Sequence, residues 1–467
     1  MKYISTRGEA PVLDFEQITL SGLASDGGLY VPEQWPRFSE DEIRAMRGLG
    51  YRALATRVIA PFCEGSLSVT ELETLLDRAY DAFDHPAIAP VKQLDDGLFF
   101  MELFHGPTLA FKDIALQFLG PLFDLLLSRH GRRCTIVGAT SGDTGSAAIE
   151  AVRGLEAVEL FMLHPAGRVT DVQRRQMTTV HDANIHNLAV DGTFDDCQNL
   201  VKAMFNDRAF RERHALSAVN SINWARIAAQ IVYYFRAALV LGAPDREVSF
   251  AVPTGNFGNA FAGYVAKQMG LPIRRFVIGS NRNDILTRFF ASGRMEMRQV
   301  APTLSPSMDI QISSNFERML FEFYGRDGAR TKASMTGFQE QGRIGVEREI
   351  HQAATDLFAA YRFDDEQTGA EIGRVYRDTG EIVDPHSVIG IAAAKAHLRE
   401  DASAPVMALG TAHPAKFAPA VEAAIGGPVP VPERLEKVLH AEERYTAIAN
   451  DLQAVERFID TAGEDQG

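Results

Sequence analysis

Apolar and polar residues follow one another along most of the chain in an order that predicts strand, loop and helix in turn. One helical pattern follows the loop 139–145, and another covers Ala260–Met269. Short apolar runs typical of buried strands occur at Cys134–Gly138, Leu160–Leu163, Ile185–Val190, Val248–Val252, Ile273–Ile278 and Val406–Leu409. Alternation of this kind predicts an α/β fold with parallel twisted sheets, flanking helices, and ligands at the carboxyl ends of the strands.

The first 90 residues have a different pattern. Helical periodicity lies around Asp41–Ala60 and Val69–Phe83. The dipeptides His85-Pro86 and Ala89-Pro90 then mark a boundary. We therefore expect an N-terminal mixed domain at 1–90.

Composition and charge narrow the classes of partner. The chain has 467 residues, is 46% hydrophobic and carries a formal net charge of −14 without a block of Lys or Arg. Nucleic acid and anionic membranes are therefore poor partners, and a small molecule is the better expectation. The N-terminus has no apolar signal core, and no stretch approaches the roughly 18 apolar residues of a membrane span. The three cysteines are far apart and fit a reducing compartment, so we expect a cytoplasmic protein.

Lys112 stands directly before an apolar helical run, in the stretch LFHGPTLAFKDIALQ. An ammonium group pressed against apolar neighbours has a lowered pKa, and the neutral amine is a nucleophile towards aldehydes. Taken alone, the stretch fits equally well a lysine whose head group reaches water.

Three glycine-containing turns follow predicted strands. Gly255-Asn256-Phe257-Gly258-Asn259 precedes a helix and suits a phosphate monoester, which backbone N–H groups and the helix dipole would hold without a lysine. The turn containing Thr140, Ser141, Asp143 and Thr144 suits a carboxylate or phosphate, although an ordinary helix cap explains it as well. Thr411 presents a hydroxyl at the end of the last predicted strand.

Three further polar residues are candidates for substrate contacts. Arg282 follows a predicted strand and could supply charge for an anionic substrate. Asp384 is a predicted N-cap with Pro385 in the first helical position, and His386 follows it. No HExxH, paired-cysteine zinc spacing or GxSxG elbow occurs, so no metal is expected.

A nucleophilic lysine together with a phosphate-binding turn that lacks lysine indicates an aldehyde cofactor that carries a phosphate. Pyridoxal 5'-phosphate fits, since its aldehyde binds the lysine and its pyridine ring withdraws electrons.

At these residues the sequence resembles the threonine synthases of the bacterial and fungal branch, which belong to the tryptophan-synthase-β family (fold type II). The matching segments run through nearly the whole chain in the family's order. They are MKYISTRG, ASDGGLYVP, ELFHGPTLAFKD, GATSGDTGSAA, PTGNFGNA, SNRND, SPSMDIQISSNFER, VDPHS and LGTAHPAKF.

The resemblance implies a large cofactor-binding domain formed by 91–133 and 245–467 and a small domain at 134–244. It also implies a role for individual residues. Lys112 matches the lysine that binds the cofactor and acts as catalytic base, Gly255 to Asn259 match the loop around the cofactor phosphate, and Thr411 matches the hydroxyl that faces the pyridine nitrogen. Asp143 stands where many relatives have an asparagine facing the cofactor's phenolic oxygen. Thr140, Ser141, Thr144, Arg282, Asp384 and His386 are the expected substrate-binding residues.

The implied activity is conversion of O-phospho-L-homoserine and water into L-threonine and phosphate, the last step of threonine biosynthesis, by a monomer or homodimer. Two alternatives stay open at this point. One is a phospholyase or dehydratase that releases 2-oxobutyrate from the same cofactor chemistry. The other is a binding protein on the same fold without catalytic activity.

Overall fold

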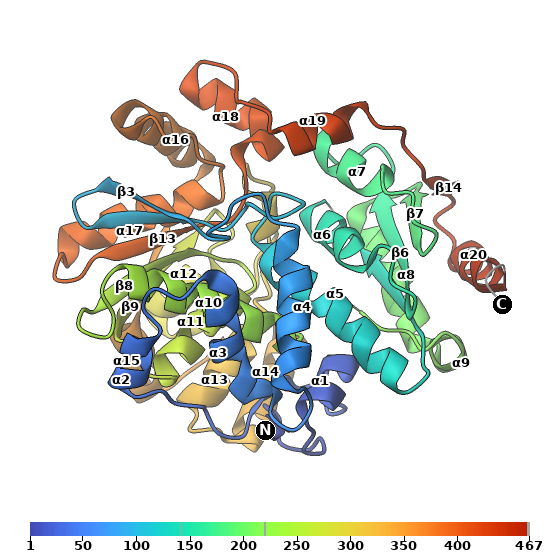
Figure 1. Cartoon of the computed structure of the whole chain (residues 1–467), viewed down its shortest axis with the longest axis horizontal. Coiled ribbons are helices and arrows are strands. Elements are labelled where there is room, and N and C mark those ends of the chain that lie inside the picture. Colours follow the sequence, from blue (N-terminus) through green and yellow to red (C-terminus); the bar gives the residue numbers. More distant parts are fainter. Residues whose placement is uncertain (141, 219–220, 465–467) are drawn as a thin grey trace. The chain divides into compact units, whose positions relative to one another are not determined.

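The computed structural model describes residues 1–140, 142–218 and 221–464 (Figure 1). Contacts within the chain define two compact units. Unit 1 comprises Met1–Ala115 and Ser221–Pro430, and unit 2 comprises Leu116–Asn220 and Val431–Gly467. Each unit contains a sheet with parallel strands, which confirms the α/β class that the alternating pattern predicts.

Unit 1 is built around a six-stranded sheet. Its order is β12-β9-β8-β13-β4-β3, and every neighbouring pair is parallel except β3 with β4. The strands are β3 (Val91–Asp95), β4 (Leu98–Glu102), β8 (Val248–Pro253), β9 (Ile273–Ser280), β12 (Phe358–Arg362) and β13 (Val406–Gly410). Every residue of β8 and β13 is buried, because helices cover both faces of a parallel sheet.

Helices of unit 1 surround this sheet. They are α10 (Trp224–Val240), α11 (Gly258–Gln268), α12 (Ile285–Ser292), α13 (Phe316–Phe323), α14 (Gly328–Gln341), α15 (Arg348–Leu357), α16 (Asp365–Thr379), α17 (Ser387–Glu400) and α18 (Ala418–Ile425). Short 3-10 turns occupy Pro306–Met308 and Pro414–Phe417, and a small antiparallel pair joins β10 (Arg294–Glu296) to β11 (Arg343–Gly345). The sequence analysis missed β3, β4 and β12.

The N-terminal part adds one strand pair and four helices to unit 1. They are β1 (Tyr3–Ser5), β2 (Tyr30–Pro32), α1 (Phe15–Ser21), α2 (Glu40–Ala45), α3 (Tyr51–Cys63) and α4 (Val69–Asp81). The helical pattern expected around Asp41–Ala60 is divided between α2 and α3, because Gly48 adopts a φ of +80° and Gly50 is the extended N-cap of α3.

The core of this N-terminal part is continuous with the rest of unit 1. The rings of Tyr3 and Phe62 lie 5.9 and 5.6 Å from that of Trp224 at the start of α10. Contacts therefore place 1–90 in one unit with 221–430, and 431–467 in unit 2, which differs from the three expected ranges.

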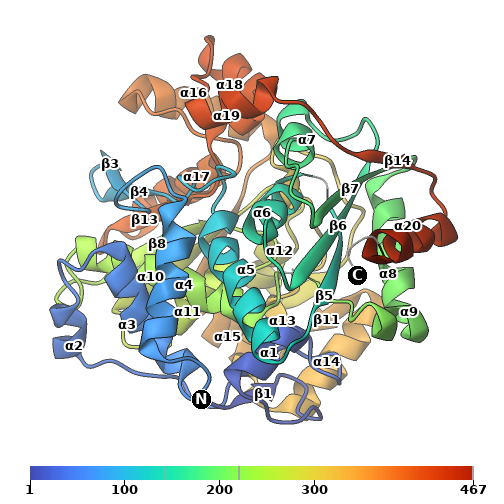
Figure 2. The same ribbon diagram turned by 45° about the vertical axis from the view of Figure 1, so that its right-hand side comes forward.

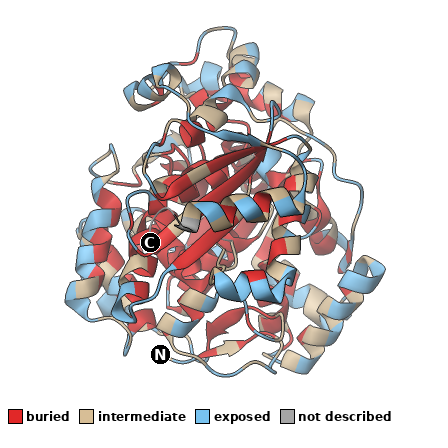
Figure 3. Cartoon of the chain, turned by 90° about the vertical axis from the view of Figure 1, so that its right-hand side faces the viewer, coloured by how far each residue is buried: buried red, intermediate tan, exposed pale blue. Residues whose placement is uncertain are grey.

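Unit 2 contains a four-stranded parallel sheet of order β14-β7-β6-β5. Its strands are β5 (Cys134–Ala139), β6 (Val158–Pro165), β7 (Ile185–Val190) and β14 (Thr446–Ile448), and its helices are α6 (Asp143–Val152), α7 (Asp171–Thr178), α8 (Phe194–Asn206), α9 (Arg208–Arg213), α19 (Glu433–His440) and α20 (Leu452–Glu464). Helix α6 lies on one face of the sheet, and α8 and α20 lie on the other (Figure 2). The central strands β6 and β7 are almost entirely buried (Figure 3), whereas the edge strand β14 is mostly exposed.

Helix α5 (Lys112–Arg129) begins in the sequence range of unit 1 and continues into that of unit 2. Among the described residues, no helix combines the length and apolar character needed to cross a membrane.

Candidate active site

Lys112 is the first residue of α5, as the apolar run after it predicts. Its side chain is half-buried, and Nζ lies 5.6 Å from the centre of the Phe111 ring. The amine is therefore presented at a helix start beside an aromatic ring, with partial access to solvent.

The turn before Lys112 is fixed by the buried carboxylate of Asp113. It accepts hydrogen bonds from Thr108 N at 2.9 Å and Thr108 Oγ1 at 2.6 Å, while Lys416 Nζ donates to the carbonyl oxygen of Thr108 at 2.7 Å. Burial raises the pKa of Asp113 to about 6. A Cβ atom on Gly106 would lie 2.4 Å from Cβ of Asp113, so the turn has no room for another side chain there.

Backbone hydrogen bonds tie this turn to the loop after β13. Phe111 N donates to the carbonyl oxygen of Thr411 at 2.8 Å, and His413 N donates to that of Leu109 at 3.0 Å. Thr411 N in turn donates to Ser387 Oγ at the start of α17. The structure thus brings Lys112 and Thr411 onto two segments joined directly to each other.

The Thr411 hydroxyl is buried, with 6% of the residue exposed, and Oγ1 has no hydrogen-bond partner among the described residues. A buried hydroxyl without a partner costs free energy, so this atom is a marker for a group that binds next to it.

The loop Gly255–Asn259 connects β8 to α11. Phe257 has a φ of +62° and packs its ring between Phe316 and Phe358, and no side chain caps α11. A Cβ atom on Gly255 would lie 3.0 Å from the Ile310 side chain. The loop therefore presents the positive end of a helix without a cap of its own.

Two hydrogen bonds hold this loop from outside. Ser313 Oγ donates to the carbonyl oxygen of Gly255 at 2.7 Å, and Asn315 N donates to that of Asn256 at 3.0 Å. The hydroxyls of Tyr233 and Tyr234 donate to Oδ1 of the buried Asn259 at 2.6 and 2.8 Å. Its Nδ2 group, by contrast, is buried without a partner in the described part of the chain.

Asp384 and His386 form a buried pair before α17. The carboxylate accepts from His386 N at 2.8 Å and from Ser387 N at 3.2 Å. Helix α17 begins at Ser387 with His386 as its N-cap residue, so the prediction of Asp384 as N-cap with Pro385 in the first helical position is wrong by two residues. His386 Nδ1 lies 2.9 Å from the same carboxylate, and its Nε2 accepts from Ser307 N at 3.2 Å. Because Nε2 accepts from a backbone N–H, the ring N–H that points to the Asp384 carboxylate is that of Nδ1.

Arg282 is exposed in the loop between β9 and α12. Its neighbours Asn281 and Asn283 are buried, and their side-chain amides donate to Oδ1 of Asp309 at 2.8 and 2.9 Å. Burial raises the pKa of Asp309. The buried polar cluster in this region is thus formed by the neighbours of Arg282.

In unit 2, the turn after β5 is closed by its own side chains. Thr140 Oγ1 accepts hydrogen bonds from the N–H groups of Gly142 and Gly145, both at 2.9 Å. Asp143 is the first residue of α6, and its carboxylate accepts from Gln173 Nε2 at 2.9 Å. Thr144 is half-buried, and Ser141 lies outside the described residues.

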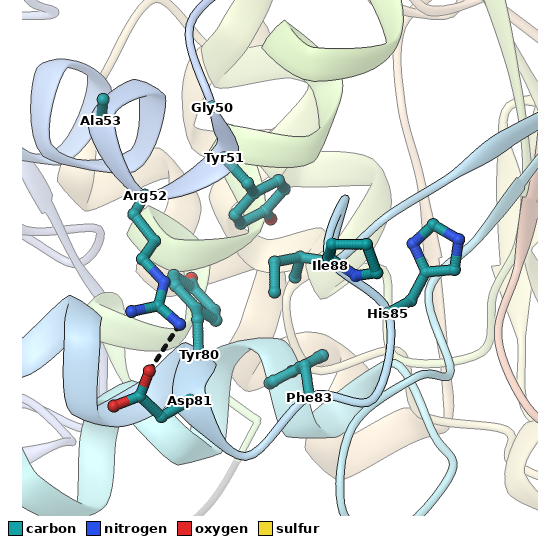
Figure 4. A pocket seen from close by; sticks show the side chains of 10 residues that line it. Gly50, Tyr51, Arg52, Ala53, Tyr80, Asp81, Phe83, His85 and Ile88 are labelled. Atoms are coloured by element: carbon teal, nitrogen blue, oxygen red, sulfur yellow. Dashed lines mark hydrogen bonds and ion pairs between the residues drawn. The ribbon is translucent and has the colours of Figure 1, made fainter.

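A hollow of about 390 Å³ lies elsewhere in unit 1, between the start of α3 and the end of α4 (Figure 4). Tyr51, Tyr80 and Ile88 give it an apolar wall, and Arg52 pairs with Asp81 at 2.6 Å. None of the predicted site residues lines it.

Several residues that position the site were missed by the sequence analysis. They are Ser387, Ser313, Asn315, Tyr233, Tyr234, Lys416 and Gln173. Each acts on a residue at least 24 positions away in the sequence, such as Ser387 on Thr411. The segment SPSMDIQISSNFER gave one usable signal, because it concentrates small polar residues directly before and within the start of α13.

Three family models match the chain. Threonine synthase N terminus matches residues 2–80, pyridoxal-phosphate dependent enzyme matches 84–410, and threonine synthase, C-terminal, matches 387–459. Together they cover the two units described above.

Relatives agree with these models. The chain is 52% identical to the threonine synthase of Pseudomonas aeruginosa over 464 residues, which is 99% of each chain. The crystal structure of threonine synthase from Brucella melitensis with bound pyridoxal phosphate matches with a TM-score of 0.97, 51% identity and 99% coverage of both chains. The yeast threonine synthase structure matches with a TM-score of 0.94, 39% identity and 99% coverage of both.

These findings confirm fold type II and the pyridoxal phosphate cofactor. The chain belongs to the threonine synthase family of pyridoxal-phosphate-dependent enzymes.

Proposed function

We propose that this enzyme converts O-phospho-L-homoserine and water into L-threonine and phosphate. The observation that carries the proposal is the pairing of Lys112 at a helix start with the buried, unpartnered hydroxyl of Thr411, on segments joined by the Phe111–Thr411 hydrogen bond of 2.8 Å. The relatives are named threonine synthases, and this name supports the choice of substrate.

The residues of unit 1 suit the cofactor. Gly255 and Gly258 leave space that a side chain would fill, since a Cβ atom on Gly258 would lie 3.2 Å from Asn315 Nδ2. An uncapped helix start and the open Asn259 Nδ2 group favour a phosphate there. The Thr411 hydroxyl is free to bond to the pyridine nitrogen.

Lys112 is proposed to bind the cofactor and to move protons at the α- and β-carbons of the substrate. When bound, pyridoxal phosphate withdraws electrons and so acidifies the α-carbon. The packing of Asp113 and Thr108 keeps the lysine at the start of α5, and the Phe111 ring shields one side of the amine.

The assignments in unit 2 and around α17 are proposals as well. Asp143 is assigned to the cofactor's phenolic oxygen. The hydrogen bond from Gln173 Nε2 supports this assignment, because it orients the Asp143 carboxylate before the cofactor binds. Thr140, Ser141, Thr144, Arg282, Asp384 and His386 are assigned to the substrate. For His386 a positioning role fits best, because both ring nitrogens are already engaged.

Atoms balance in the proposed reaction. The β-carbon loses a proton, the C–O bond at the γ-carbon breaks and phosphate leaves with the electron pair, and the γ-carbon gains a proton. The hydroxyl of water then adds at the β-carbon, and the remaining proton of the water goes to the phosphate. One positioned water is needed at this last step, and other water has to be kept out at the earlier ones.

Product analysis tests the proposal. The purified protein is incubated with O-phosphohomoserine in water labelled with oxygen-18. We expect threonine as the main product, with the label in its hydroxyl group and one phosphate released per threonine. Mainly 2-oxobutyrate would place the chain with the phospholyases, and no release of phosphate would leave only a binding protein.

We also propose that the enzyme works in the cytoplasm as a monomer or homodimer, without nucleic acid or membrane partners, and that the domain limits at 90, 133 and 244 mark functional parts of the chain. The strongly negative net charge supports the absence of nucleic-acid and anionic-membrane partners. Light scattering of the purified protein at several concentrations measures the oligomeric state.

A further inference from the structure

Asp309 is a half-buried carboxylate that ties together two segments of unit 1. From the loop after β9, Nδ2 of Asn281 and Nδ2 of Asn283 donate to its Oδ1 at 2.8 and 2.9 Å. From the segment that precedes Asp309 in the chain, Thr303 Oγ1 donates to Oδ1 at 2.7 Å and Thr303 N donates to Oδ2 at 2.9 Å. Hydrogen bonds to a carboxylate are stronger than those between neutral groups, so this tie is a firm one.

The same loop after β9 holds the segment before Asp309 by further bonds. Asn283 forms a closed pair with Ala301, because its Nδ2 donates to the carbonyl oxygen at 2.8 Å and its Oδ1 accepts from Ala301 N at 2.9 Å. Asn281 Nδ2 also donates to Ser305 Oγ at 3.0 Å. Strand β9 lies inside the six-stranded sheet, so these bonds anchor residues 301–309 to the rigid part of unit 1.

Both chain neighbours of Asp309 contact the start of the loop between β8 and α11. A Cβ atom on Gly255 would lie 3.0 Å from the Ile310 side chain and 3.3 Å from Cα of Met308. Further along the same segment, Ser313 Oγ donates to the carbonyl oxygen of Gly255 at 2.7 Å. A shift of Asp309 would therefore move groups that touch Gly255.

Asp26 is a carboxylate with a similar set of bonds but without this connection. It is half-buried as well, and it accepts from Ser5 Oγ at 2.8 Å and from the N–H groups of Gly28, Glu9 and Ala10 at 2.9 Å. All four donors lie within the first 28 residues. Asp26 therefore serves as a matched structural carboxylate in the same unit.

We propose that Asp309 is a positioning residue for the phosphate of the cofactor, and that it acts through Ile310 and Ser313 on Gly255. The proposal rests on the function proposed above for Gly255–Asn259. Backbone N–H groups carry no full charge, so they hold an anion well only when the loop fixes their directions before the anion arrives. Asp309 supplies this fixation from outside the loop.

The test measures binding of pyridoxal phosphate, and of pyridoxal, which lacks the phosphate, to the apoprotein by equilibrium dialysis. Asp309→Asn keeps the size of the side chain but turns one acceptor into a donor, which then faces either Thr303 N–H or the three donors at Oδ1. Asp26→Asn makes the same change in the control carboxylate. Thr303→Val removes only one donor to Asp309 and keeps the proposal testable if Asp309→Asn does not fold.

We expect Asp309→Asn to weaken binding of pyridoxal phosphate about 10- to 30-fold and to leave binding of pyridoxal unchanged, because only the phosphate uses the loop. Thr303→Val should weaken it about 3-fold. Asp26→Asn should lower the melting temperature without changing either affinity. The phosphorus-31 NMR signal of the bound cofactor should move in Asp309→Asn and stay in place in Asp26→Asn.

Wild-type affinity of Asp309→Asn for pyridoxal phosphate, or an equal loss of affinity for both compounds, overturns the proposal. Ser313→Ala removes the bond to Gly255 directly. If it weakens binding while Asp309→Asn does not, the loop assignment stands and the role of Asp309 falls. No substrate is present in these measurements. A protein that binds the cofactor as expected but forms no threonine would therefore contradict the proposed function and leave the role of Asp309 intact.

Discussion

The starts of helices α11 and α6 follow similar glycine-containing turns after buried strands, but their polar groups are satisfied in opposite ways. In the α6 turn, Thr140 Oγ1 accepts two backbone N–H groups and Asp143 is bonded to Gln173. In the α11 turn, the residue before the helix is Phe257 in a left-handed conformation, and Asn259 Nδ2 is left open.

The contrast shows how a turn whose backbone N–H groups bond to its own side chain differs from one that keeps a donor without a partner. A turn whose own side chains take up the free N–H groups is stable without help. A turn held from outside by Ser313 and Asn315, with donors left over, becomes fully satisfied only when an anion is present. Substitutions on the two turns should therefore have different kinds of effect.

The largest effect is expected from Lys112→Ala, which removes the amine but leaves the α11 turn intact. Activity should fall by about 1000-fold or more, because one group serves both cofactor binding and proton transfer. The cofactor should still bind through its phosphate, with a changed visible absorption band. Lys332→Ala, an exposed lysine paired with Glu9, is the control. Borohydride reduction of the wild type followed by peptide mapping should find the pyridoxyl group on Lys112, and a label on another lysine would contradict the assignment.

Gly258→Asp attacks the α11 turn itself. Its Cβ atom would lie 3.2 Å from Asn315 Nδ2, and its carboxylate would repel the phosphate, so cofactor retention should be lost. Gly369→Asp, in α16 with no atom near its Cβ, should bind cofactor normally. Equilibrium dialysis measures both, and wild-type retention by Gly258→Asp would mean that the phosphate binds elsewhere.

Thr140→Val should instead lower stability. Two buried N–H groups lose their acceptor, which should reduce the free energy of unfolding of the apoprotein by about 2–4 kcal/mol. Thr254→Val removes the acceptor of one N–H group, that of Phe257 at 3.1 Å, and should cost about half as much. Urea denaturation gives both values. Equal losses would remove the distinction between the two turns.

Thr411→Val should have the smallest effect. The lost hydrogen bond to the pyridine nitrogen should slow turnover about 5- to 10-fold, which corresponds to roughly 1 kcal/mol. The apoprotein should be at least as stable as the wild type, since the hydroxyl has no partner in it. Thr411→Ser is the matched control and should retain most of the activity. Unchanged steady-state kinetics in Thr411→Val would exclude this role.

Local patterns allowed much of the fold and of the site to be predicted. The strands around 134, 160, 185, 248, 273 and 406 are present because continuous apolar runs are buried on both faces of a sheet. Lys112 was placed correctly at a helix start, since the apolar periodicity begins directly after it.

What sequence could not reveal depends on contacts between distant residues. The split between α2 and α3 depends on Gly48, whose positive φ no periodicity shows. Ser387 accepts a hydrogen bond from Thr411 N, 24 positions away in the sequence, and no local pattern shows this contact.

The open donors of unit 1 have a consequence for the lifetime of the protein in a cell. Thr411 and Asn259 carry buried groups without a hydrogen-bond partner in the described part of the chain. A ligand that binds only the folded protein stabilises it, so we expect the apoprotein to be less stable than the loaded enzyme. Proteases act on the unfolded fraction, and a difference of 1–2 kcal/mol changes abundance several-fold. We therefore expect the amount of this enzyme to follow the vitamin B6 supply of its host, with no regulator needed to sense it.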